Sequence, residues 1–203
     1  PEALLMDVGS TKRDVEAAAR RVLGERLARF VPAHPIAGKE VSGVEHADPE
    51  LYRGKQVILT PIDRTQPAHL QKAQALWEGL GCHVQQMAPE QHDAAFAAVS
   101  HLPHLLAFAL VHAIANQPQG KEILSLGGPG FKDFTRIAAS DPKMWRDVLL
   151  SNRHELVEQA KMFQRSLHNM LQLAEEGNGE KLEEMISQAS TTRAHWRMGQ
   201  KAK

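Results

Sequence analysis

The stretch HPIAG, His34 to Gly38, decides how this chain is interpreted, because a constrained histidine directly follows a short apolar segment at residues 29–33. Pro35 fixes its own φ and favours extended backbone at His34, and Gly38 permits close approach of another group. An imidazole accepts protons near neutral pH. We therefore expect His34 at the end of a strand, where α/β sheets bind ligands. A loop histidine with a satisfied backbone contact would give the same pattern.

The surrounding sequence changes character near Pro89. Before it, apolar strands alternate with amphipathic helices, which predicts a mostly parallel α/β sheet. The expected strands are residues 3–6, 29–33, 57–60 and 82–87, and the expected helices are 11–27 and 67–80. Beyond it the pattern is helical, with expected helices at 89–116, 131–140, 142–176 and 181–194. Residues 117–130 are expected to form a loop.

The expected helix at 142–176 has Asp141 as its N-cap and Pro142 at its first position. At about 1.5 Å per residue it would be roughly 50 Å long. An apolar seam of that length needs a neighbouring helix, so we expect a homodimer formed through the helical region. In the helix at 89–116, Pro103 removes one N–H and predicts a kink.

Composition excludes several classes of protein. The 203 residues carry 24 basic and 24 acidic side chains, so nothing favours nucleic acid as a partner. The single cysteine, Cys82, fits the cytoplasm. The longest apolar run, residues 105–111, is shorter than the roughly 20 residues of a membrane span, so no membrane partner is expected. The chain begins Pro1-Glu2 without Met, which is typical of a fragment.

Two further motifs carry candidate site residues. DVGSTK at residues 7–12 places Ser10 just after the first expected strand, although simple helix capping by Ser10 or Thr11 would also explain it. SHLPH at residues 100–104 places Ser100 and His104 on one helix face. These residues suit substrate contact or a buried polar cluster. A metal site that includes His92 is disfavoured by spacing, so no metal is expected.

A glycine-rich segment, GGPGFKDFTR at residues 127–136, ends in Arg136. A guanidinium grips both oxygens of a carboxylate, so Arg136 is a candidate carboxylate ligand. Pairing with Asp133 or Asp141 is the structural alternative. Trp145 lies near the start of the long helix and fits the core or an interface as well as a site.

Taken in this order and spacing, these motifs resemble those of the prephenate and arogenate dehydrogenases of tyrosine biosynthesis, from about residue 4 to about residue 173. The resemblance implies an α/β remnant of a dinucleotide-binding, Rossmann-like domain at residues 1–88. An all-α helical substrate-binding and dimerisation domain would follow at residues 89–203.

The resemblance also implies an activity: oxidative decarboxylation of prephenate or arogenate, with NAD or NADP accepting the hydride. His34, in its neutral form, would be the catalytic base. Ser10 would lie between the nicotinamide and His34, with both a catalytic and a cofactor-binding role. The residues implied to bind substrate are Arg136, His104, Ser100 and Trp145.

This sequence departs from the family pattern in two places. No G-x-G-x-x-G turn follows a strand, so we expect the chain alone to lack full cofactor binding and to be inactive. Pro129 stands where family members commonly carry Gly. Two alternatives remain open: a non-catalytic helical dimerisation or ligand-binding module, and the substrate domain of another small-acid dehydrogenase.

Overall fold

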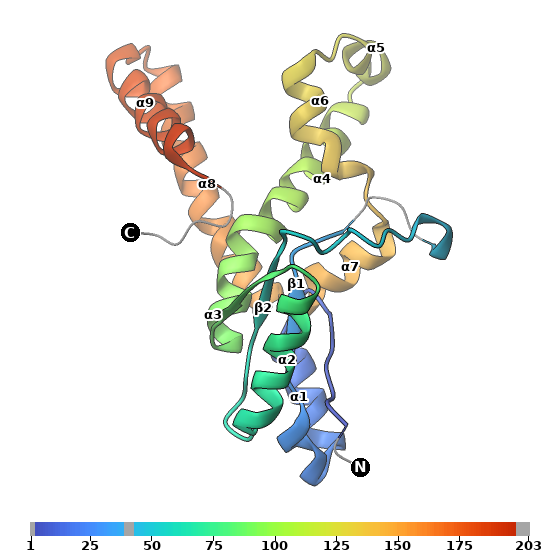
Figure 1. Ribbon diagram of the computed structural model, residues 1–203. Coiled ribbons are helices and arrows are strands. Elements are labelled where there is room, and N and C mark those ends of the chain that lie inside the picture. Colours follow the sequence, from blue (N-terminus) through green and yellow to red (C-terminus); the bar gives the residue numbers. More distant parts are fainter. Residues whose placement is uncertain (1–2, 39–42, 198–203) are drawn as a thin grey trace. The chain divides into compact units, whose positions relative to one another are not determined.

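The computed structural model describes residues 3–38 and 43–197 (Figure 1). The chain forms two compact units, Pro1–Leu156 and Val157–Lys203. The first unit contains a small α/β region and most of the helices. The second is a pair of helical segments. The combination of a small α/β region with a helical region confirms the predicted fold class.

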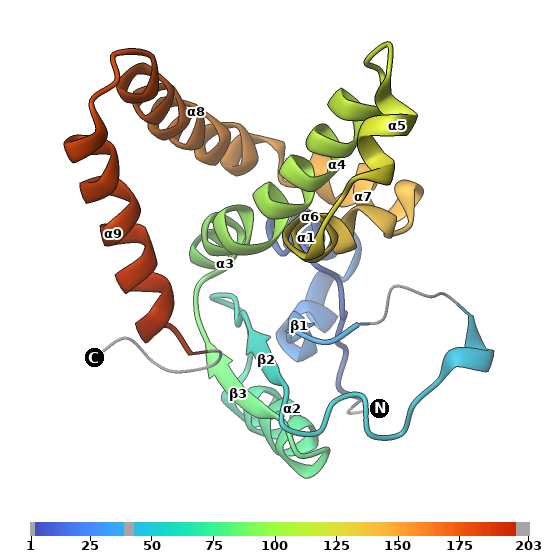
Figure 2. The same cartoon turned by 90° about the horizontal axis from the view of Figure 1, so that it is seen from above.

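Three strands form the sheet of the first unit in the order β1-β2-β3 (Figure 2). They are β1 (Ala33–Pro35), β2 (Gln56–Leu59) and β3 (His83–Gln86). β2 and β3 are parallel, as predicted, but β1 runs antiparallel to β2. Ahead of β1, Leu5 forms a single parallel bridge with Phe30. His34 thus lies in the middle of β1, where it pairs with Ile58 of β2.

Two helices accompany the sheet, α1 (Arg13–Val22) and α2 (Pro67–Gly79). α2 packs against the sheet and buries Ala73 and Trp77 in a core of Val31, Ala33, Val57, Leu59 and Cys82. The predicted helix at 11–27 is shorter than expected: Gly24 adopts a φ of 53°, and a 3-10 helix follows at Gly24–Arg29. A left-handed residue cannot continue a helix, so α1 ends there. A second 3-10 turn spans Val44–His46.

A continuous helical segment follows the sheet. It comprises α3 (Pro89–Phe96), a π-helical turn at Ala97–His101 and α4 (Leu102–Ala115). Pro103, from which a kink was predicted, lies in the first turn of α4, directly after this π-helical turn, and the kink itself stays a prediction. Such single turns frequently occur at functional sites.

By length and composition alone, Pro89–Ala115 could cross a membrane, because it has 27 residues and a mean hydropathy of 1.7 in its most apolar part. The longest uninterrupted apolar run, residues 105–111, is much shorter than this segment, so the sequence prediction underestimated the length of its apolar part. However, it carries the buried polar side chains of His92, Asp93 and His101, all of which are hydrogen-bonded within the protein. These internal partners favour a helix that packs against the protein.

Beyond α4, the region expected to be a loop contains α5 (Gly120–Ser125) and the start of α6 (Pro129–Thr135). Pro129 begins α6, where a missing N–H leaves no helical bond unmade, so the local fold accommodates it. A 3-10 turn at Arg136–Ala139 leads to α7 (Pro142–Ser151). Asp141 caps α7 as predicted, accepting the Met144 N–H at 2.7 Å.

The single helix predicted at 142–176 is wrong. The helix breaks at Asn152, which has φ −106° and ψ 27°, and α8 (Arg153–Glu175) begins after it. The Asn152 side chain donates to the backbone carbonyl of Asp93. That tertiary contact overrides a local sequence that is compatible with a continuous helix. α8 has 23 residues, about 34 Å at 1.5 Å per residue.

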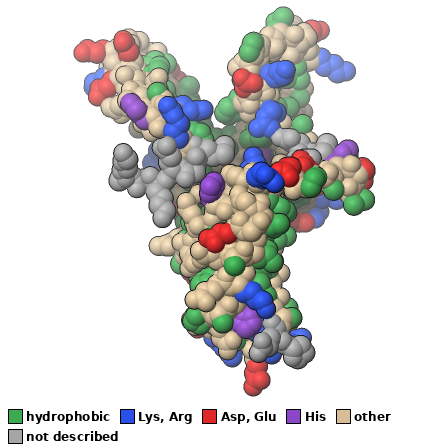
Figure 3. Space-filling model, viewed as in Figure 1, with side chains coloured by type: hydrophobic (Ala, Val, Ile, Leu, Met, Phe, Trp, Pro, Cys, Tyr) green, Lys and Arg blue, Asp and Glu red, His purple; other side chains and the backbone are tan. Residues whose placement is uncertain are grey.

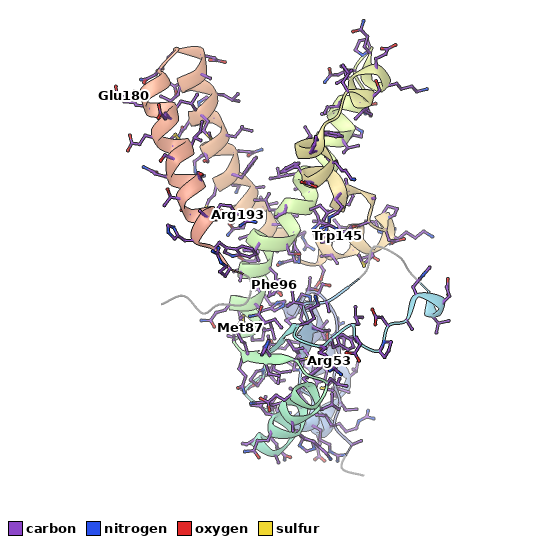
Figure 4. All side chains as sticks on the ribbon, turned by 45° about the horizontal axis from the view of Figure 1, so that its top comes forward. Arg53, Met87, Phe96, Trp145, Glu180 and Arg193 are labelled. Carbon is purple, nitrogen blue, oxygen red and sulfur yellow. The ribbon has the colours of Figure 1, made fainter. Side chains whose placement is uncertain are left out.

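The second unit consists of the remainder of α8 and α9 (Gly179–His195). Gly177, with a φ of 66°, ends the first segment. Asn178 then caps α9 by accepting the Lys181 N–H at 3.2 Å. The break predicted at residues 177–179 is therefore confirmed. At the end of α9, the Arg193 guanidinium (labelled in Figure 4) lies 5.1 Å from the Trp196 ring.

Candidate functional site

The loop that carries Ser10 is fixed to the strand that carries His34. Asp7 Oδ1 accepts the backbone N–H of Ala33 at 3.2 Å. Lys12 Nζ donates to the Ala33 carbonyl at 2.7 Å and forms an ion pair with Asp7. Because Ala33 directly precedes His34, these contacts hold the loop that contains Ser10 beside the strand that contains His34.

Lys12 is fully buried, which is rare for an ammonium group. Burial lowers its pKa, and the carboxylate of Asp7 opposes that shift. A buried charge must be paired to be tolerated. The sequence analysis treated this segment only as a helix cap or a place for Ser10, so the buried ion pair is a feature that it missed.

His34 has an unexpected partner, His92 of α3. The two atoms His34 Nδ1 and His92 Nε2 are 2.8 Å apart. The other ring nitrogen of His92, Nδ1, lies 2.8 Å from Oδ1 of Asp93. Phe96 covers this pair, stacked on His92 with ring centroids 4.5 Å apart and 4.8 Å from His34. Sequence reasoning considered His92-Asp93 only as metal ligands.

Asp93 also caps a second helix. Its carboxylate accepts the backbone N–H groups of Lys12 at 2.9 Å and Arg13 at 3.0 Å, the first groups of α1. Burial raises the pKa of Asp93, but hydrogen bonds from His92, Arg13 and Lys12 outweigh it and leave the pKa below its usual value. Asp93 is therefore ionised and accepts hydrogen bonds only.

His34 is neutral at physiological pH. Burial lowers its pKa to about 3; the positive charge of Lys12, and that of His92 and His101 when they are protonated, adds to that shift, while Asp93 opposes it. A neutral imidazole has one N–H and one lone pair. The residue can therefore accept a proton, provided that the lone pair faces the reacting group.

Asn152 joins the His92–Asp93 pair to the π-helical turn. Its amide Nδ2 donates to the Asp93 carbonyl at 2.8 Å and lies 3.1 Å from His101 Nδ1. Burial lowers the pKa of His101 to about 4, so this ring is neutral as well. Its Nδ1 accepts from the amide, and its buried Nε2 has no hydrogen-bond partner among the described residues.

Trp145 of α7 connects this group to the last predicted site residues. It lies at 6.3 Å from the His101 ring and stacks on His104 with ring centroids 3.5 Å apart and an interplanar angle of 20°. His104 Nδ1 donates to the backbone carbonyl of Ser100 at 2.9 Å. Burial lowers the pKa of His104, the bond to Ser100 opposes this, and the charge of Arg136 lowers it further.

The described contacts therefore form a continuous series from the sheet to the helices. It begins at His34, passes through His92 and Asp93, and continues through Asn152 and His101 to Trp145 and His104. In Figure 4, the Phe96 label marks the part of the series that contains His34 and His92. The Trp145 label marks the part that contains His101 and His104. Ser10 is tied to it only through the Asp7–Lys12 loop.

A cavity of about 420 Å³ borders the same residues from the α1 side. Asp93, Asn152, Arg13 and Arg153 are among its lining residues. Neither His34 nor Arg136 lines it. Among residues 3–38 and 43–197, no group of three His, Cys, Asp or Glu side chains is arranged to hold a metal ion.

The fold is a small α/β region followed by a helical region, and a series of buried histidines joins the two. Two family models match along almost the whole chain: the nucleotide-binding domain of prephenate dehydrogenase at residues 1–86 and its dimerisation domain at residues 88–188. The chain belongs to the prephenate dehydrogenase family. This confirms the resemblance inferred from the motifs.

Curated relatives agree. A prephenate dehydrogenase of Bacillus subtilis (strain 168) is 36% identical over 182 residues, which cover 89% of this chain and 49% of the relative. A cyclohexadienyl dehydrogenase of Zymomonas mobilis is 32% identical over 158 residues, which cover 77% of this chain and 53% of the relative. The chain thus spans about half the length of the curated relatives it matches.

Solved structures are also similar. Prephenate dehydrogenase from A. aeolicus, in complex with hydroxyphenyl propionate and NAD+, matches with a TM-score of 0.88 and 41% identity, over 96% of this chain and 68% of that one. Arogenate dehydrogenase from Synechocystis matches with a TM-score of 0.81 and 27% identity, over 95% of this chain and 69% of that one.

Proposed function

We propose that this chain contributes the proton-accepting and substrate-binding parts of an NAD- or NADP-dependent dehydrogenase that oxidises and decarboxylates prephenate or arogenate. The observation that carries the proposal is the series of contacts from His34, in β1, to His104 and Trp145 of the helical region, where the positive charge of Arg136 lowers the pKa of His104. Family membership and the A. aeolicus complex with hydroxyphenyl propionate support the choice of substrate class.

In this proposal, His34 takes the proton of the substrate's ring hydroxyl. The neutral state of His34 supports this role, but a pKa of about 3 describes a weak base. A bound diacid brings negative charge beside the imidazole, and a nearby opposite charge raises the pKa of a histidine. Binding of the substrate therefore strengthens the base that the reaction needs.

The substrate-binding roles follow from charge and shape. Arg136 grips a carboxylate, since its guanidinium presents paired donors. His104 and Trp145 form a flat stacked pair against which a six-membered ring packs. Ser100 contributes through its backbone carbonyl, which fixes the His104 tautomer. Ser10 orients His34 or the nicotinamide from the neighbouring loop.

The cofactor fits this chain only in part. A bound nicotinamide would accept the hydride, but dinucleotide phosphates need a free helix N-terminus. The first N–H groups of α1 are already bonded to Asp93. The described residues therefore offer no pyrophosphate cradle at α1, which agrees with the missing glycine-rich turn.

The helical region supports a homodimer. Large apolar side chains on α5, α6 and the neighbouring turn are exposed, among them Ile123, Leu126 and Phe134, and apolar atoms are visible on this arm in Figure 3. Exposed apolar patches commonly mark interfaces. Sedimentation equilibrium should give twice the monomer mass of 22.5 kDa. The cytoplasm remains the predicted compartment.

Binding and turnover test the proposal separately. Calorimetric titration with prephenate and with arogenate should detect binding that is weakened about tenfold or more in Arg136→Gln, the loss of a charge-assisted bond. The exposed neighbour Arg146→Gln is the matched control. Absence of binding of both acids by the unsubstituted chain would overturn the proposal. Binding without turnover when NAD or NADP is added would favour the non-catalytic module instead.

A further inference from the structure

The three groups Asp93, His92 and His34 lie in one line of hydrogen bonds, each at 2.8 Å. His92 is fully buried and Asp93 is 2% exposed, so water does not compete for these bonds. A histidine has two distinct ring nitrogens, and the bond at one decides which proton the other carries. The most acidic of the three groups therefore decides which atom donates and which accepts in each of the two bonds.

Asp93 sets that direction. Its carboxylate already accepts two backbone N–H groups, from Lys12 and Arg13, and these donors favour the ionised form. A carboxylate has no proton to donate, so His92 Nδ1 must carry the N–H of the bond between them. A neutral His92 then has a lone pair on Nε2. That nitrogen accepts, and His34 Nδ1–H donates.

We infer that Asp93 and His92 are positioning residues, which hold His34 with its proton on Nδ1 and thereby leave the Nε2 lone pair for the substrate hydroxyl. Neither residue touches the reacting atoms in this arrangement. The consequence for catalysis rests on the proposed function, but the tautomer is a property of the chain itself and is measurable without substrate or cofactor.

The surrounding contacts restrict the alternative orientation. Phe96 packs on both imidazole rings, at 27° to His92 and 58° to His34, and limits their rotation. Asn152 holds the backbone carbonyl of Asp93 from the other side. Rotation of His92 would break its bonds to Asp93 and His34 together and leave buried polar atoms unpaired, which is unfavourable.

Long-range proton–nitrogen correlation spectra of the ¹⁵N-histidine-labelled chain at pH 7 test the inference. His34→Asn identifies the His34 signals by their disappearance. In the unsubstituted chain, His34 should show a protonated Nδ1 and a bare Nε2. A bare Nδ1 on His34 would overturn the inference, since it would mean that His92 donates, as an imidazolium or as the opposite tautomer.

Two substitutions at His92 form a matched pair. His92→Gln places an amide oxygen where Nε2 accepted, and the His34 tautomer should be retained. His92→Leu removes the acceptor, and the Nδ1-protonated form should lose its dominance. An unchanged His34 tautomer in folded His92→Leu would contradict the inference. If the tautomer is as inferred but the chain binds neither prephenate nor arogenate, only the proposed function fails.

Discussion

Asn152 donates to the backbone carbonyl of Asp93 at 2.8 Å, across 59 residues of sequence. The bond ties the break between α7 and α8 to the first helix after the sheet. The same amide nitrogen lies 3.1 Å from His101 Nδ1, so one side chain contacts both Asp93, the partner of His92, and His101. The helix interruption and the site geometry thus have a common cause.

Replacing this residue should be costly. Asn152→Ala leaves the buried His101 Nδ1 without a partner and removes one of the two donors to the Asp93 carbonyl, the other being the Ala97 N–H, which should lower the free energy of unfolding by about 2 kcal/mol. Asn116→Ala removes an exposed amide that bonds to the His112 carbonyl, and is the matched control with an expected loss below about 0.5 kcal/mol. Urea denaturation measures both. Equal losses in the two variants would contradict the buried role.

Stability should fall in acid through the buried histidines. The folded pKa of His101 is about 4 and that of His34 about 3, both below the ordinary value of 6.5. The unfolded chain binds more protons below pH 6.5, so stability is fully present above that pH and is lost as the pH falls toward 4. His101 alone accounts for about 3 kcal/mol.

Unfolding midpoints measured from pH 7 to pH 4 check this expectation. His101→Gln should flatten the pH dependence, because one depressed imidazole is gone. The exposed His195 of α9, changed to Gln, should leave the dependence unchanged. A His101→Gln profile parallel to that of the unsubstituted chain would show that this residue does not titrate as described.

Binding of a diacid should raise the pKa of His34. The titratable groups that act on its pKa are His92, Lys12, His101 and Asp93, and the first three of these lower the pKa. Added carboxylates oppose their potential. Histidine NMR titration with and without prephenate measures the shift, which should be upward by about one unit or more. A downward shift would place the bound carboxylates away from His34.

The buried ammonium of Lys12 should be essential for the loop that carries Ser10. Lys12→Met leaves Asp7 without its cation and should cost about 3 kcal/mol or more of unfolding free energy. Adding Asp7→Asn should recover part of that loss, as a double-mutant cycle requires. The adjacent but half-exposed Arg13→Met is the control, expected to cost less than about 1 kcal/mol.

Dinucleotide binding to this chain should be weak or undetectable. The N-terminus of α1 is bonded to Asp93, and the sequence has no glycine-rich turn after a strand. Calorimetric titration with NAD and NADP measures the affinity directly. Tight binding of either would show that phosphate recognition uses residues other than those described.

The sequence predicted the α/β-then-helical order well, because alternating apolar runs and the Asp141-Pro142 start are local signals. It failed where distant contacts decide. Nothing near Asn152 opposes a continuous helix, and only its bonds to Asp93 and His101 account for the break. A metal site that includes His92 was considered and disfavoured, and no other role was predicted for this residue, since an adjacent His-Asp pair does not reveal that a strand 58 residues earlier supplies its partner. The roles of the predicted site residues stay predictions.

The carboxylate of Asp93 serves α1 and His92 at once. If α1 moved away from α3, the Asp93 carboxylate would lose its two backbone N–H donors. His92 would then lose the fixed carboxylate that orients its ring. A change in the separation of α1 and α3 would consequently change the proton affinity of His34.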